Sequence, residues 1–161
     1  MATPIQIANL AALIANKGYF YTPHIIKSIE GGEIDSVYRT KHVVNIKEKY
    51  FDVVQEGMEA VVTKGTARFN GQIDGVSYCG KTGTAQNPHG EDHSIFMAFA
   101  PKDNPQIAIA VYVENSGFGA TWAVPIASLM IEKYLHREIA SKRLHIEKRM
   151  MESVIEPKEK K

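Results

Sequence analysis

At 161 residues the chain has the length of one domain, and its 44% apolar and 23% charged composition is typical of a globular protein. The net charge of +1 gives no broad electrostatic attraction for nucleic acid or for a membrane surface. The single cysteine excludes an internal disulfide framework, and no apolar run reaches the roughly 18 residues that a transmembrane helix needs.

The first predicted element is a helix over residues 3–17. Thr3, Pro4 and Gln6 have the pattern of a capping box, with Thr3 as the N-cap, and Asn16-Lys17-Gly18 is a typical C-terminal stop. Met1-Ala2-Thr3 leads straight into this helix with no visible signal peptide, which is typical of an expressed fragment. The sequence alone therefore predicts a soluble chain without a targeting signal.

Residues 19–38 are predicted to form a small hairpin. An aromatic and β-branched stretch over 19–29 precedes the turn at 30–33, and residues 34–38 return as the second strand. His24 has no partner at the spacing of metal ligands, so we interpret it as a structural residue.

A second helix is predicted over residues 46–63. Asn45 to Glu48 again resemble a capping box, and a Met- and Phe-containing apolar stripe follows, which we interpret as core packing and not as a cofactor site. The stripe consists of Phe51, Val54, Met58 and Val61. Lys64 to Ala67 end this helix, and a polar loop runs from there to Gly75.

Three strand candidates follow, over residues 76–86, 94–100 and 107–113. Their short connections predict an antiparallel meander, and a last helix is expected over about 121–136. The predicted fold class is α+β, with an antiparallel sheet of three core strands plus a small hairpin, packed by N-terminal and C-terminal helices. Residues 1–136 are expected to form the folded part, and residues 137–161 a charged C-terminal tail with a short helix.

The first core strand carries the stretch Cys79-Gly80-Lys81-Thr82-Gly83-Thr84-Ala85-Gln86. Because side chains alternate along a strand, Thr82 and Thr84 share one face, while Lys81 and Gly83 share the other. Gly83 leaves the second face open to a close approach. Backbone N–H groups, two hydroxyls and an ammonium together suit an anionic ligand such as a carboxylate. Cys79 has the same side-chain parity as Lys81, so a reactive thiol is open beside the alternative of a small buried side chain.

A phosphate loop and a histidine metal site both match short patterns in the sequence, but the neighbouring residues disfavour each of them. Gly75 to Thr82 match the phosphate-loop pattern, yet a polar segment precedes them and Gly83, Pro88 and Gly90 oppose the helix that should follow. His89 and His93 have metal-ligand spacing only on a helix, which Pro88 and Gly90 also disfavour. The sequence therefore predicts neither a metal nor a cofactor, and no nucleic-acid partner.

Lys81-Thr82-Gly83 is the K-T-G triad of penicillin-binding proteins and class A β-lactamases. The longer run Gly80 to Gln86 resembles the G-K-T-G-T-A-Q form of class B penicillin-binding transpeptidases. Four further segments are similar in order and spacing: Ala2 to Gln6, Gly65 to Ala67, Phe99 to Pro101 and Val113 to Asn115. The resemblance covers roughly residues 2–136 and looks closest to the elongation-type penicillin-binding protein 2 branch.

The resemblance implies an incomplete serine β-lactamase/transpeptidase-like fold and a parent enzyme that cross-links peptidoglycan stem peptides. Lys81 would supply positive charge near the nucleophile, and the Thr84 N–H would be one oxyanion-hole donor. The substrate-binding strand would comprise Thr82, Gly83, Thr84, Ala85 and Gln86, whose threonine hydroxyls hold the carboxylate of D-alanyl-D-alanine or of a β-lactam. The parent would be anchored in the bacterial inner membrane and face the periplasm.

The family's nucleophile lies in S-x-x-K and its second motif is S-x-N. None of the eight serines of this sequence has lysine three positions later or asparagine two positions later. We therefore expect a fragment that is inactive alone; a non-catalytic D-alanyl-D-alanine-binding module and a nucleotide-binding protein are the alternatives. Strands that the family takes from preceding sequence are absent here, which predicts an open sheet edge and self-association.

Overall fold

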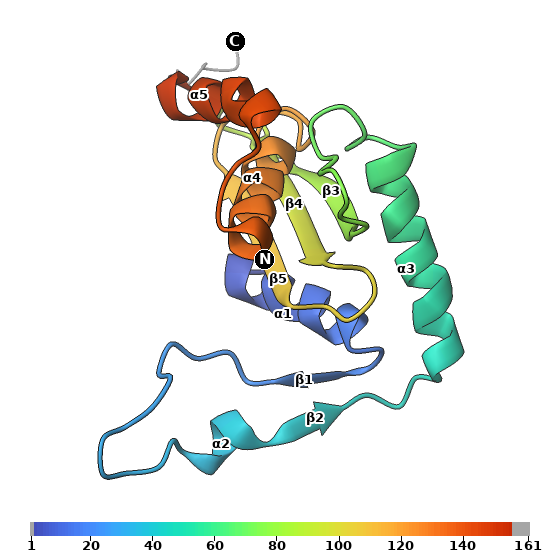
Figure 1. Ribbon diagram of the computed structural model, residues 1–161, viewed down its shortest axis with the longest axis vertical. Coiled ribbons are helices and arrows are strands. Elements are labelled where there is room, and N and C mark those ends of the chain that lie inside the picture. The colour runs from blue at the N-terminus through green and yellow to red at the C-terminus, as the bar shows by residue number, and fades with distance from the viewer. Residues whose placement is uncertain (1, 156–161) are drawn as a thin grey trace.

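The computed structural model describes residues 2–155, and the predicted tail residues 156–161 lie outside the described residues. In chain order the helices and strands are α1 (Pro4–Ala15), β1 (Tyr19–Tyr21), α2 (Ser36–Arg39), β2 (Lys41–Val43), α3 (Glu48–Thr63), β3 (Cys79–Ala85), β4 (His93–Ala100), β5 (Ile107–Val113), α4 (Ala123–His136), the 3-10 turn η1 (Ser141–Arg143) and α5 (Leu144–Glu152). Figure 1 shows their arrangement around the central strands. No helix within residues 2–155 has both the length and the apolar character needed to cross a bilayer.

The central sheet is an antiparallel meander in the order β3-β4-β5, as the short connections predicted. Its register pairs Thr82 with Phe96 and Thr84 with Ser94. The combination of this sheet with helices on both faces confirms the α+β fold class.

Two clusters of buried side chains hold helices against the two sheet faces. On one face, Phe96, Ala98 and Ile109 pack against residues of α4, among them Val124 and Ile131. On the other face, Cys79 and Phe99 pack against Ile14 of α1 and Met58 of α3. In Figure 1, α4 and α1 accordingly lie against the sheet, and α3 stands beside β3.

The small second sheet differs from the predicted hairpin. β1 pairs with β2, with Tyr19 opposite Val43, so the partner strand is 41–43 and not 34–38. Residues 36–39 instead form α2, because the Asp35 side chain accepts a hydrogen bond from the Val37 N–H at 2.9 Å and caps the turn. The excursion between the two strands extends away from the rest of the molecule (Figure 1).

The N-terminal helix has the predicted capping box. The Thr3 N–H donates to the Gln6 side chain at 2.8 Å, and the helix begins at Pro4. The prediction of a second capping box at Asn45 to Glu48 is wrong, because α3 begins at Glu48 and its N-cap, Lys47, makes no side-chain hydrogen bond.

The buried face of α3 is also rotated from the predicted stripe. Val54 is 44% exposed, whereas Gln55 is buried and donates from Nε2 to the Ile14 carbonyl at 2.7 Å. A hydrogen-bonded glutamine is thus part of the core, which a search for apolar periodicity does not detect. The buried positions are Phe51, Gln55, Met58 and Val62.

Candidate functional site

The predicted ligand-binding residues lie on β3, which is an edge strand of the described sheet. Lys81 and Thr84 are exposed, while Thr82, Gly83 and Ala85 are half-buried. Gln86 follows directly after the strand and is exposed. β4 pairs with one side of β3, so the backbone groups that point to the other side are open to a ligand.

The Thr66 and Thr82 hydroxyl oxygens lie 2.9 Å apart and share a hydrogen bond. Thr66 reaches β3 because the chain folds back sharply after α3: Gly65 N–H donates to the Ala60 carbonyl and Ala67 N–H to the Val61 carbonyl. A Cβ at Gly65 would lie 2.8 Å from the Val61 Cα, so only glycine fits this turn. Sequence reasoning identified the Gly65 to Ala67 turn but not this contact.

Thr82 and Thr84 share a sheet face, as the alternation predicted, and their cross-strand partners connect that face to the chain before α4. Ser94, opposite Thr84, donates from Oγ to the Phe118 carbonyl and accepts from the Ala123 N–H, both at 3.1 Å. The loop after β5 is thereby fixed next to Thr84.

Gly119 brings that same loop into direct contact with the backbone of β3. A Cβ at this position would lie 2.7 Å from the Gly83 carbonyl oxygen and 2.5 Å from that of Ile95. The chain therefore lies flat over the sheet only because residue 119 has no side chain. The sequence pattern alone did not reveal this contact.

The Lys81 ammonium lies close to its own strand, where Nζ donates to the Thr82 carbonyl at 2.8 Å. Among residues 2–155 it forms no ion pair, so its positive charge stays available on the exposed edge. An exposed cation and two hydroxyls along the same strand edge make this end of β3 suited to an anion.

Cys79 is a buried packing residue and not a nucleophile. Its thiol is fully buried and donates to the Gln55 carbonyl at 3.2 Å. Burial raises the pKa of this thiol to about 12, and the cation that acts against this shift is Lys102, not Lys81. The hypothesis of a thiolate activated by Lys81 is therefore wrong.

The geometry supports neither the phosphate loop nor the histidine metal site that were considered from the sequence. Lys81 and Thr82 lie inside a strand, so they do not open the helix that a phosphate loop requires. His93 accepts a hydrogen bond on Nδ1 from the Asn115 N–H at 3.0 Å, and its ring lies 5.2 Å from that of Tyr112. Asn115 also bonds the Asn87 amide at 2.6 Å, so His93 belongs to the contacts that join the β3–β4 loop to the end of β5.

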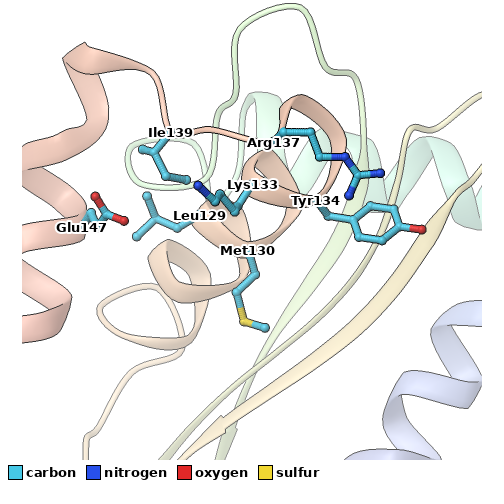
Figure 2. Close-up of a pocket in the computed structure, with 7 residues that line it drawn as sticks. All are labelled: Leu129, Met130, Lys133, Tyr134, Arg137, Ile139 and Glu147. Carbon is cyan, nitrogen blue, oxygen red and sulfur yellow. The ribbon is translucent and has the colours of Figure 1, made fainter. Parts of the chain in front are cut away.

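A hollow of about 560 Å³ lies elsewhere, between α4 and the segment that leads into α5. Figure 2 shows its lining, in which the Arg137 and Lys133 side chains accompany apolar groups, and none of its residues comes from β3. The lining residues are Leu129, Met130, Lys133, Tyr134, Arg137, Ile139 and Glu147. The candidate carboxylate site is thus an open strand edge and not the hollow.

Comparison with known protein families matches residues 1–132 to the penicillin-binding protein transpeptidase domain. The chain belongs to the penicillin-binding protein transpeptidase family. The matched residues include α1, α3 and all three strands of the central sheet, so the sequence resemblance is confirmed.

Relatives of this transpeptidase chain are of the type that the K-T-G stretch suggested. It is 32% identical over 158 residues to the peptidoglycan D,D-transpeptidase MrdA of Haemophilus influenzae, covering 86% of this chain and 24% of that protein. It is 38% identical over 132 residues to penicillin-binding protein 2A of Bacillus subtilis, covering 69% and 18%. The chain thus spans about a quarter or less of the length of these relatives.

Solved penicillin-binding proteins have the same arrangement of elements. The crystal structure of Pseudomonas aeruginosa PBP2 in complex with WCK 5153 superposes with a TM-score of 0.74 at 39% identity, covering 88% of this chain and 32% of that one. The ceftriaxone acyl-enzyme of Mycobacterium tuberculosis penicillin-binding protein A superposes with a TM-score of 0.70 at 31% identity, covering 83% and 32%.

Proposed function

We propose that this chain is the C-terminal part of a peptidoglycan D,D-transpeptidase domain and carries its carboxylate-binding strand. The observation that carries the proposal is the run Gly80 to Gln86 on the open edge of β3, with the Thr82 hydroxyl held 2.9 Å from that of Thr66. The family membership and the acyl-enzyme complex of a structural neighbour support it.

In this proposal the Thr82 and Thr84 hydroxyls donate to the carboxylate of a D-alanyl-D-alanine terminus or of a β-lactam. Lys81 supplies the positive charge of the site, and residues Gly83, Ala85 and Gln86 present backbone groups along the bound peptide. The Thr84 N–H is one oxyanion-hole donor; a donor of this kind contributes about 3–4 kcal/mol to transition-state stabilisation.

We further propose that the chain alone is not acylated. None of its eight serines stands in S-x-x-K or S-x-N, and without a nucleophile the covalent step cannot occur. The intact enzyme would supply both motifs from preceding sequence and would act on peptidoglycan at the outer face of the inner membrane. The division into a transpeptidase portion over 1–136 and a tail over 137–161 belongs to the same proposal.

A titration with an N-acylated D-alanyl-D-alanine peptide, followed by the backbone amide signals of β3, tests the binding site. We expect saturable shifts at Lys81 to Ala85, and Thr82→Val should weaken the affinity about tenfold to a hundredfold, the range for one lost hydrogen bond to a charged group. The matched control is Thr63→Val on the exposed end of α3, which should leave the affinity unchanged. Absence of saturable shifts at β3 would contradict the proposal.

The same geometry supports self-association of the isolated chain. β3 is an open edge, and apolar side chains such as Ile5 of α1 and Val53 of α3 are 59% and 66% exposed. Open strand edges and exposed apolar groups favour pairing with another chain. In the intact enzyme these surfaces would be covered by preceding sequence.

A further inference from the structure

Arg143 lies beyond residues 1–132, which match the transpeptidase domain, yet its side chain is only 6% exposed. Its Nη1 donates to Glu132 Oε2 at 2.8 Å, and its Nη2 donates to Ser128 Oγ at 2.6 Å. The chain turns back after α4 towards α5 (Figure 1). Both partners of Arg143 are on α4, so a buried ion pair holds the returning chain against this helix. Such a pair is stable only with both charges present.

The network continues from α4 into the loop between α3 and β3. The single proton of the Ser128 hydroxyl lies within reach of two carbonyl oxygens, that of Asn70 at 3.0 Å and that of Pro125 at 2.9 Å. The residue after Asn70, Gly71, accepts from the buried Tyr78 hydroxyl at 2.6 Å. Burial raises the pKa of Tyr78, so this hydroxyl stays protonated and remains a donor.

Gly71 completes the connection to the site. Its N–H donates to the Ala67 carbonyl at 2.8 Å, and a Cβ at Gly71 would lie 2.6 Å from that oxygen. Ala67 is buried and directly follows Thr66, which bonds Thr82. Hydrogen bonds, linked by the peptide bonds between Asn70 and Gly71 and between Thr66 and Ala67, therefore join a residue of the C-terminal segment to the carboxylate-binding strand.

We propose that Arg143 is a positioning residue that, through Ser128 and Asn70, fixes the loop over residues 65–71 and holds the Thr66 hydroxyl against Thr82. The function of the positioned hydroxyl rests on the proposed carboxylate site, whereas the positioning itself does not.

Amide hydrogen exchange of the ligand-free chain tests the positioning. In Arg143→Met the amides of Ala67 and Gly71 should exchange faster, but an unpaired Glu132 also destabilises the whole fold. Arg143→Met/Glu132→Gln removes both charges and keeps an acceptor for the Ala140 N–H. The β4 amides report the stability of the whole fold, and in this double variant they should exchange at nearly the rates of the original chain. The amides of Ala67 and Gly71 should still exchange about twofold to tenfold faster than in the original chain, as expected for one lost hydrogen bond.

Two single variants sharpen the comparison. Ser128→Ala removes the hydroxyl that accepts from Arg143 and faces the Asn70 and Pro125 carbonyls, and it should speed exchange at Ala67 and Gly71 by a similar factor. Lys142→Met is the matched control, because the adjacent Lys142 pairs with Asp74 on the exposed surface. It should leave both amides unchanged.

A double-mutant cycle on the affinity for the D-alanyl-D-alanine peptide tests whether the Arg143–Glu132 pair and Thr66 are coupled. In the original chain Thr66→Val should weaken binding of the D-alanyl-D-alanine peptide about twofold to tenfold. In the Arg143→Met/Glu132→Gln background the same change should have a smaller effect, because Thr66 is held less firmly against Thr82.

Two results would overturn the positioning role. One is that the exchange rates of the Ala67 and Gly71 amides change in parallel with those of the β4 amides in every variant. The other is that Thr66→Val lowers the affinity for the peptide by the same factor in both backgrounds. If the original chain does not bind the peptide, the proposed carboxylate site fails, and the exchange rates still decide the role of Arg143.

Discussion

The hydroxyl oxygens of Thr66 and Thr82 lie 2.9 Å apart, although 16 positions separate the two residues in the sequence. One threonine follows α3 and the other is in the K-T-G triad of β3. The contact places another hydroxyl group next to Thr82. The proposed anion site would therefore be built from two segments of the chain and not from one strand.

Gly119→Ala should destabilise the protein by about 1–3 kcal/mol, because the new methyl group would overlap backbone oxygens of Gly83 and Ile95 that cannot move independently. Urea denaturation measures the loss. Gly57→Ala is the control: apart from the adjacent residues and the helix's own backbone, no atom lies within 4 Å of a Cβ there, and α3 should gain up to about 1 kcal/mol. Equal effects of the two changes would show that residue 119 does not contact the sheet as described.

Cys79 should resist thiol reagents in the native protein. Burial raises its pKa to about 12, so hardly any thiolate forms at pH 8 (about one part in ten thousand) and the sulfur is out of reach of solvent. Modification, followed by mass, should appear only as denaturant unfolds the chain. Rapid labelling without denaturant would place this thiol on the surface and contradict the core described here.

Glu59 should make the protein sensitive to acid. Hydrogen bonds from Lys102 at 2.6 Å and Ser77 at 2.5 Å lower the pKa of this carboxyl below its usual 4.5. Because the folded-state pKa is the lower one, the stabilisation is present above pH 4.5 and is lost as the pH falls through the folded value.

Glu59→Gln tests this acid sensitivity. The variant should be less stable at pH 7 by about 1 kcal/mol, and the difference should shrink as the pH is lowered. Thermal melts at pH 7 and pH 3 measure both values. A difference that stays constant over this range would show that the ionised carboxylate is not the stabilising form.

Self-association should be visible by sedimentation velocity as dimers or larger species that grow with concentration. Ala85→Lys places a charge on the β3 edge and should shift the distribution to the monomer. Val53→Lys on α3 separates the two surfaces: a response to this change alone would assign the contact to the helix face. A single monomeric boundary at high concentration would contradict the prediction.

Much of the fold was predictable because local signals and packing agree. Spacing alone predicts the Thr3 capping box and the three strands with short connections. It also predicts that Thr82 and Thr84 lie on the same face of β3. The pattern failed where a polar side chain decides the local structure, in the core for Gln55 and at an exposed helix N-terminus for Asp35. Gln55 rotates the buried face of α3, and Asp35 turns an expected strand into α2.

The parts of the site that sequence reasoning missed depend on contacts between distant segments. Nothing local to Gly119 indicates that it lies on Gly83, and nothing in the charged C-terminal stretch marks Arg143 as buried. Its partners Glu132 and Ser128 become visible only when α4 and the following turn are placed together.

One titration tests the central claim, a carboxylate-binding strand without its nucleophile. Benzylpenicillin is added to the isolated chain while the amide signals of β3 and the intact mass of the protein are recorded on the same sample. We expect reversible, saturable shifts at Lys81 to Ala85 with no gain in mass. A covalent adduct, or shifts that leave β3 untouched, would contradict it.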